Sequence, residues 1–159
     1  MNKFCRFLSV ALVIALAFTL TACGSPRVPI TAAQFISAAE NAGYQTIDGT
    51  DQFGDGAVDQ VILAGNDNIK VEFYVLPTAD QTKDAYAENK QMFESAKGST
   101  SSNVSVALNN YGYYTQTSAG IFCAVAYIDN TMIYATVADT YRSEVNDFIT
   151  SLGYLGKAR

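Results

Sequence analysis

The chain has 159 residues, of which 49% are apolar and 16% charged, a composition typical of a globular protein with a core of its own. Its formal net charge is −5, and an acidic surface repels phosphate backbones, so nucleic acid is not expected as a partner. The sequence contains no histidine, which removes the most common general base and the most common zinc ligand.

Residues 1–22 have the pattern of a secretory signal peptide. Lys3 and Arg6 form a positively charged start, and an uncharged, mainly apolar run of about 14 residues follows from Phe7 to Leu20. This run is shorter than the roughly 18 apolar residues that indicate a membrane span. The sequence therefore predicts that residues 1–22 are removed during secretion.

The signal ends in the segment Leu20, Thr21, Ala22, Cys23. It resembles the lipobox of bacterial lipoproteins, which is a leucine, two small residues and a cysteine. The resemblance implies cleavage between Ala22 and Cys23 and a diacylglyceryl group, with fatty acids such as palmitate, on the Cys23 sulfur. It also implies a protein anchored to the extracytoplasmic face of the cell membrane, because two acyl chains hold a protein there stably. The alternative is an ordinary signal peptide with a cysteine near its cleavage site.

Residues 23–30 are expected to form a short tether, and residues 31–159 a single domain. Of the three cysteines, Cys5 lies in the signal peptide and Cys23 would carry the lipid, so no disulfide is expected within the domain. The remaining one, Cys123, lies in an apolar, strand-like run without a basic neighbour. We expect it to be a buried, unreactive thiol.

Three helices are predicted from capping boxes, apolar residues at helical spacing and terminal glycines. Their expected ranges are 31–42, 78–97 and 139–152. Thr31 with Gln34 and Thr78 with Gln81 form the capping boxes of the first two helices.

Between the helices, apolar residues recur at every second position, which indicates strands. The expected strands are 58–64, 69–76, 111–117, 121–128 and 131–138. The first two flank a four-residue loop at 65–68, and the last three are joined by the link 118–120 and by a two-residue turn at Asp129 and Asn130. The segment 98–105 is interpreted as a polar linker. These elements predict an α+β fold: an antiparallel sheet of about six or seven strands with helices mainly on one face. A pair of smaller sheets is the alternative.

Pairing across these turns predicts that four tyrosines share the sheet face that the helices leave uncovered: Tyr111, Tyr113, Tyr127 and Tyr134. Tyrosine offers a flat, rigid contact area with a polar tip, which suits a sugar or a protein partner. These four residues are the candidate binding face. The alternative is that they only pack, because tyrosine favours half-exposed sheet faces.

The segment 48–59 concentrates four carboxylates among glycines: Asp48, Asp51, Asp55 and Asp59. Calcium takes six to eight oxygen ligands, but Ile62 stands where a calcium-binding loop of this spacing needs its bidentate glutamate. We therefore expect no metal, and interpret the segment as an acidic turn with side chain–backbone hydrogen bonds. The same carboxylates could serve as a glycosidase pair, so the alternative function is a membrane-anchored hydrolase that acts on envelope material.

No serine–histidine pair, Ser-x-x-Lys motif or phosphate-binding glycine loop is present. No catalytic residue is assigned and no cofactor is expected. The sequence predicts a lipid-anchored binding or accessory module of the cell envelope. Its expected partners are the membrane, through the lipid on Cys23, and a cell-envelope protein or glycan. Its layout resembles that of small bacterial lipoproteins.

Overall fold

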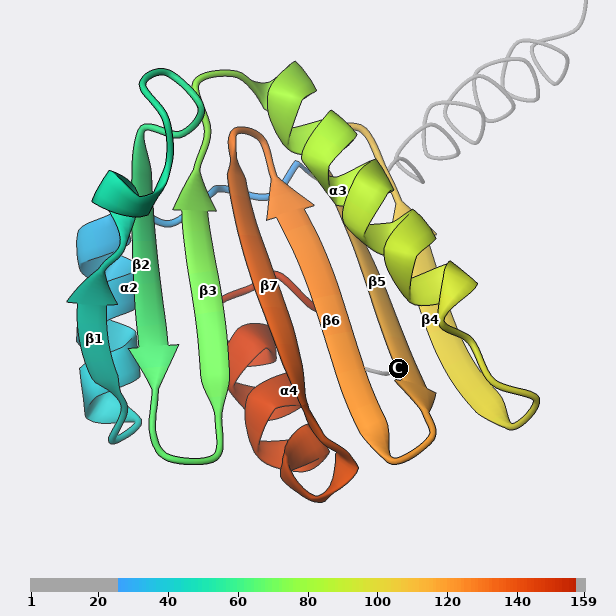
Figure 1. Ribbon diagram of the computed structural model, residues 1–159. Coiled ribbons are helices and arrows are strands. Elements are labelled where there is room, and N and C mark those ends of the chain that lie inside the picture. Colours follow the sequence, from blue (N-terminus) through green and yellow to red (C-terminus); the bar gives the residue numbers. More distant parts are fainter. Residues whose placement is uncertain (1–25, 157–159) are drawn as a thin grey trace, which may run out of the picture.

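The computed structural model describes residues 26–156, which contain one seven-stranded antiparallel sheet with strand order β1-β2-β3-β7-β6-β5-β4 (Figure 1). The strands are β1 (Gln45–Asp48), β2 (Gln60–Gly65), β3 (Lys70–Val75), β4 (Ser101–Ala107), β5 (Tyr111–Ser118), β6 (Ile121–Ile128) and β7 (Thr131–Ala138). The helices are α2 (Ala32–Asn41), α3 (Ala79–Ser95) and α4 (Arg142–Ser151), with short 3-10 helices η1 (Thr50–Gln52) and η2 (Asp139–Tyr141). The α+β class and the strand number are as predicted, and the strands form one sheet rather than two.

The predicted signal peptide, its cleavage site and Cys23 lie outside the described residues. Within residues 26–156, no helix combines the length and the apolar character needed to cross a bilayer.

The helix starts follow the predicted capping residues. The Thr31 hydroxyl accepts a hydrogen bond from the Gln34 backbone N–H at 3.2 Å, and the Gln34 side chain accepts one from the Thr31 N–H at 2.8 Å. The Thr78 hydroxyl accepts from the Gln81 N–H at 3.2 Å. These bonds satisfy backbone donors that the first helical turn leaves free, and they confirm where α2 and α3 begin.

The helices cover both faces of the sheet, so the expectation that they lie mainly on one face is wrong. In Figure 1, α3 crosses in front of the sheet, while α2 and α4 lie behind it. The cause is the strand order: β3 and β4 point the same way but are separated by β7, β6 and β5. The connecting helix must therefore cross these strands on one face. It does so in a right-handed crossover, which is the strongly preferred hand.

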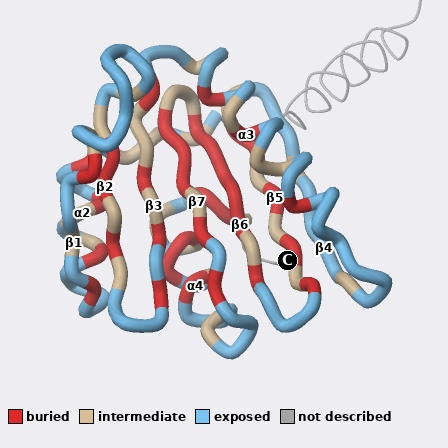
Figure 2. Tube along the Cα trace, viewed as in Figure 1, coloured by how far each residue is buried: buried red, intermediate tan, exposed pale blue. Residues whose placement is uncertain are grey.

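Each face of the sheet has its own core, and the central strands β6 and β7 are buried along most of their length (Figure 2). The α2/α4 side is built mainly from aliphatic and phenylalanine side chains, including Phe35, Ile62, Phe73, Ile133 and Phe148. The α3 side is smaller and rich in tyrosine, and its buried residues are Leu76, Tyr86, Phe93, Tyr114, Val125, Tyr127 and Met132.

The turn between β5 and β6 is shorter than predicted, which changes the register of the two strands. Ser118 pairs with Ile121, so only Ala119 and Gly120 lie in the turn, with φ of 51° and 77°. Tyr113 therefore faces Ala126 rather than Val125. Because side chains alternate along a strand, this shift by one residue moves every β5 side chain to the other face.

The candidate binding face of four tyrosines is therefore not formed. Tyr111 and Tyr113 point to the α2/α4 side, while Tyr127 and Tyr134 belong to the α3 side. The turn at Asp129 and Asn130 is as predicted and places Val125 beside Tyr134, so the error lies only in β5.

The β2–β3 hairpin shows the opposite outcome of a misplaced loop. Its four-residue loop is 66–69 rather than 65–68, and Ile62 pairs with Phe73 rather than with Val71. The register differs by two residues, so the predicted apolar face is preserved. Gly65 closes the hairpin because a Cβ there would lie 2.0 Å from the Ile69 carbonyl oxygen.

The interpretation of 98–105 as a linker is wrong, because Ser101–Ala107 forms the edge strand β4. Serine and asparagine have low intrinsic strand propensity. β4 nevertheless pairs with β5 over its whole length, from Ser101 with Ser118 to Ala107 with Gly112. Backbone hydrogen bonds to the long strand β5 therefore stabilise β4 as a strand although its side chains do not favour one.

Candidate functional site

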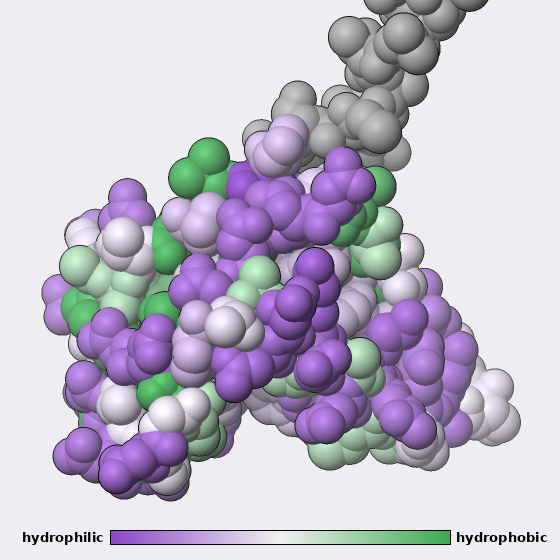
Figure 3. Space-filling view, turned by 90° about the horizontal axis from the view of Figure 1, so that it is seen from above, coloured by the Kyte–Doolittle hydropathy of each residue, from purple (hydrophilic) through white to green (hydrophobic). Residues whose placement is uncertain are grey.

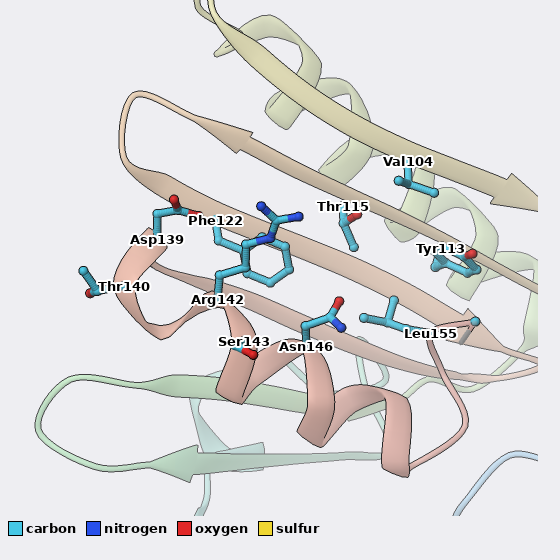
Figure 4. Close-up of a pocket in the computed structure, with 11 residues that line it drawn as sticks. Val104, Tyr113, Thr115, Phe122, Asp139, Thr140, Arg142, Ser143, Asn146 and Leu155 are labelled. Atoms are coloured by element: carbon cyan, nitrogen blue, oxygen red, sulfur yellow. The ribbon is translucent and has the colours of Figure 1, made fainter. Parts of the chain in front are cut away.

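A groove lies on the α2/α4 side of the sheet, where β4 and β5 extend beyond α4 (Figure 4). We call it the α4 groove, and its volume is about 590 Å³. It is lined by Val104, Tyr113, Thr115, Phe122, Asp139, Thr140, Arg142, Ser143, Asn146, Leu155 and Gly156. The β-strands supply its floor, the start of α4 supplies one wall, and the segment after α4 closes one end.

The floor of the α4 groove is aromatic and apolar. Phe122 and Leu155 are almost fully buried, Tyr113 is half-buried, and Val104 is exposed. Gly156 packs closely against the tyrosine, since a Cβ at this position would lie 2.9 Å from the Tyr113 hydroxyl oxygen. A flat, partly exposed ring such as that of Tyr113, next to polar groups, is typical of ligand sites.

Arg142, the first residue of α4, carries the positive charge of the groove. Its guanidinium carbon lies 5.9 Å from the centroid of the Phe122 ring, and Figure 4 shows the side chain over the floor. The ion pairs within the described part of the chain are Lys70–Glu72, Lys83–Asp80 and Lys90–Glu94, so no carboxylate there lies within 4 Å of Arg142. With no carboxylate partner among residues 26–156, its N–H donors can bind a carboxylate or another oxyanion.

Hydroxyl and amide groups line the rest of the groove. The side chains of Thr115, Ser143 and Asn146 make no hydrogen bond to another residue in the range 26–156, so they can serve a ligand. At the far end, the Asp139 carboxylate accepts a hydrogen bond from Thr117 at 3.4 Å. A smaller hollow, of about 130 Å³, continues past Arg142 along the β4 and β5 strands. The groove therefore combines hydrogen-bonding walls with a flat floor.

Of the four predicted tyrosines, only Tyr113 reaches the α4 groove. Tyr111 is buried beneath the Arg27 guanidinium, which lies 4.0 Å from its ring centroid. Tyr127 is covered by α3, with its ring 4.9 Å from that of Tyr86. Tyr134 is half-buried and stacks on Phe93 at 5.4 Å. Three of the four therefore pack chiefly against other residues of the chain.

A second cavity, of about 340 Å³, lies on the α3 side and is lined mainly by apolar and aromatic residues, among them Phe53, Tyr74 and Met132. Its one carboxylate, Glu72, is already bound to Lys70 at 2.7 Å and accepts a hydrogen bond from the Tyr74 hydroxyl. Burial and this carboxylate raise the pKa of Tyr74. The carboxylate of this cavity is thus already bound by residues of the chain itself, namely Lys70 and Tyr74.

The predicted turn chemistry of segment 48–59 is confirmed at Asp48. Its carboxylate accepts hydrogen bonds from the Thr50 hydroxyl at 2.6 Å and from the Thr50 N–H at 2.9 Å. These bonds lower the pKa of Asp48, whereas a general acid needs a raised one. Between residues 26 and 156, no three side chains of His, Cys, Asp or Glu are placed to hold a metal ion.

Cys123 is half-buried, and burial raises the pKa of its thiol. The Thr136 hydroxyl lies 3.9 Å from the sulfur. A raised pKa leaves little thiolate at neutral pH, which agrees with the predicted unreactive thiol.

No family model matches the chain, and no curated protein is similar to it. It is similar to a crystal structure from Thermotoga maritima described as a GTP binding regulator, with 17% sequence identity over 80% of this chain and 87% of that chain and a TM-score of 0.43. At this level the similarity assigns no activity to the chain.

The groove residues other than Tyr113 were not predicted from the sequence. They come from β4, β5, β6, η2, α4 and the segment after α4, which are far apart along the chain. The one local signal is Arg142, a basic residue at the start of a helix, where the helix dipole favours acidic residues instead.

Proposed function

We propose that the chain is a lipid-anchored binding module at the extracytoplasmic face of the cell membrane, and that the α4 groove is its ligand site. The observation that supports a binding role is the open groove with its aromatic floor and with Arg142 unpaired among the described residues. The lipobox segment ending at Cys23 supports the anchor.

The lining favours a hydroxyl-rich envelope glycan that carries a single anionic group. Tyr113 offers a partly exposed flat ring for a sugar, Ser143 and Asn146 offer hydrogen bonds, and Arg142 offers a fork of donors for a carboxylate. The chain as a whole has a net charge of −5, which repels densely charged polymers at long range. We therefore expect recognition of one local anionic group rather than of a polyanion.

The anchor is tested by metabolic labelling with a radioactive fatty acid. The wild-type protein should take up the label, and Cys23→Ser should remain an unlabelled, uncleaved precursor, since serine has no sulfur for the thioether. A wild-type protein that is secreted without any label would show that the lipobox interpretation is wrong.

The groove is tested by calorimetric titration with soluble wall glycan fragments that carry carboxylates, and with the same fragments after esterification. Arg142→Ala should weaken binding of the carboxylate form about tenfold or more, because a charge-assisted hydrogen bond is lost. Lys83→Ala, which removes a positive charge from α3, is the matched control and should bind as the wild type does. Equal affinity of Arg142→Ala and wild type, or no binding of either fragment, would contradict the proposed ligand.

A further inference from the structure

Arg27 is bound firmly to the domain, although it lies only four residues after Cys23. Its backbone N–H donates to the Asn110 side chain at 3.1 Å, and the Asn110 amide donates back to the Arg27 carbonyl at 2.7 Å. Its guanidinium donates to the Gly153 carbonyl at 2.6 Å and lies 4.0 Å from the Tyr111 ring centroid. We call this set of contacts the Arg27 clamp.

The clamp joins the start of the domain to residues more than 80 positions away. Asn110 lies in the β4–β5 turn and also donates to the carboxylate of Asp129, in the β6–β7 turn, at 3.2 Å. Both turns are at the upper end of the sheet in Figure 1. Arg27 is therefore fixed to one particular end of the molecule, which we call the tether end.

The short distance along the chain limits how far the tether end can lie from a lipid on Cys23. Four residues span at most about 14 Å when fully extended. The headgroup layer on one side of a bilayer takes up about 5–8 Å of this length. Arg27 would then lie within about 10 Å of the headgroup surface, which is comparable to the range of electrostatic forces at physiological salt.

The side chains at the tether end favour contact between one corner of it and the lipid headgroups. Val28 and Leu108, which flank the clamp, are 83% and 43% exposed. Asp51, Asp55 and Asp59 lie at the same end of the sheet but in the loop beside β2, toward the other edge. Figure 3, which views the molecule from this end, shows a mainly hydrophilic surface with separate hydrophobic patches. Anionic lipids would repel these three aspartates more strongly than the Val28 and Leu108 corner, where the carboxylate of Asp129 already accepts a hydrogen bond from Asn110.

We propose that the Arg27 clamp orients the domain on the membrane, with the Val28 and Leu108 corner against the lipid headgroups and the β2–β3 and β5–β6 turns pointing away. This inference rests on the lipid anchor of the proposed function. An eight-residue strand is about 27 Å long, so the distal turns stand well clear of the lipids. The Arg142 end of the α4 groove lies near the β5–β6 turn, since β7, which leads into η2 and α4, ends opposite Ile121. This end of the groove then opens toward the rest of the envelope.

The test uses the full lipidated chain, reconstituted in vesicles of phosphatidylcholine and phosphatidylglycerol that contain a lipid spin-labelled on its headgroup. A fluorophore is placed on Leu108→Cys or on Asn68→Cys, which lies in the exposed β2–β3 turn, both in a Cys123→Ser background. Quenching at position 108 should exceed quenching at position 68 about threefold or more, because of the length of the strands. Equal quenching at the two positions, or stronger quenching at 68, would overturn the orientation.

The double variant Arg27→Ala with Asn110→Ala should bring the two quenching values close together, because it removes both the side-chain and the backbone contacts of Arg27 in the clamp. Lys70→Ala, which removes a positive charge at the distal end, should keep the difference. A difference that survives in the Arg27→Ala, Asn110→Ala double variant, with flotation on the vesicles intact, would overturn the role of the clamp but leave the lipid anchor in place. Failure of the wild-type chain to float with the vesicles would overturn the anchor and this inference together.

Discussion

The two faces of the sheet are stabilised in different ways. On the α2/α4 side, Phe35 stacks on Phe73 at 4.9 Å, and Phe148 meets Phe35 edge-on at 5.9 Å. On the α3 side, Tyr114 donates to Gln116 at 2.8 Å, and the Gln116 amide donates to the Phe93 carbonyl at 2.9 Å. The first face depends mainly on apolar burial, which is non-directional, with a buried hydrogen bond between the Thr131 and Tyr154 hydroxyls beside it. The second has a smaller apolar core, and its hydrogen bonds through Gln116 attach the helix α3 to the strand β5.

This difference has a consequence for how each helix tolerates change. Where a helix is held by apolar packing, the free energy of unfolding falls in proportion to the side-chain volume removed. A buried polar network is sensitive to single atoms, because a donor or acceptor left without its partner is costly. The following variants separate the two cases.

The largest expected effect is on the α2/α4 side. Phe73→Ala should lower the free energy of unfolding by about 4–5 kcal/mol, since its ring is fully buried and contacts both Phe35 and Tyr154. Phe93→Ala, under α3, should lower it by about 3 kcal/mol, because this ring lies at the margin of a smaller core. Urea denaturation of both variants measures the difference, and the reverse order would contradict the comparison.

The next effect is a loss of stability at high pH. Burial raises the pKa of Tyr154 from 10.0 to about 12, so the folded state holds the proton that the unfolded state releases above pH 10. This pKa difference contributes about 2–3 kcal/mol to the free energy of unfolding. The contribution is fully present below pH 10 and is lost as the pH rises toward 12.

Urea denaturation from about pH 8 to about pH 12 checks this effect. Tyr154→Phe is the matched variant, because it keeps the ring and removes the titrating group. It should show a shallower decline, although other buried tyrosines on both faces still contribute to the loss. An unchanged decline would exclude Tyr154 as a source.

A smaller effect distinguishes two hydroxyls under α3. Tyr114→Phe should cost about 1–2 kcal/mol, because it leaves the buried Gln116 carbonyl without its donor. Tyr86→Phe should cost nothing or stabilise by up to about 1 kcal/mol, since the buried Tyr86 hydroxyl has no hydrogen-bond partner among residues 26–156. Thermal unfolding of the pair measures the difference, and equal costs would show that the network does not attach α3.

The smallest effect concerns β5, whose side chains contribute to both faces. Ala119 has a φ of 51° in the β5–β6 turn, a backbone conformation that is unfavourable for alanine. Ala119→Gly should raise the free energy of unfolding by about 0.5–1 kcal/mol, because glycine adopts this conformation readily and its greater freedom in the unfolded chain offsets only part of the gain. Ser118→Gly, one residue before the turn, is the control and should not stabilise.

Ala119 also explains why the register of β5 against β6 is predicted wrongly from the sequence. Two-residue hairpin turns are recognised by residues that accept positive φ, and Asp129 with Asn130 fits that pattern. Ala119 does not fit it, so the sequence pattern predicts a link that is one residue too long and places the four tyrosines on one face. In the β2–β3 hairpin a shift by two residues left the faces intact. The parity of the error, rather than its size, decides whether a face is predicted correctly.

The elements that the sequence determined by itself are those set by interactions over a few residues. The capping box at Thr31, the N-cap at Thr78, the turn at Asp129 and the Asp48–Thr50 turn all depend on hydrogen bonds between near neighbours in the chain. The tertiary structure alone decided the strand status of β4, the register of β5, the face on which α3 lies, the α4 groove and the Arg27 clamp. Each of these depends on pairing or packing between segments distant along the chain, such as Arg27 with Gly153. Their energies come from contacts that local sequence patterns do not encode.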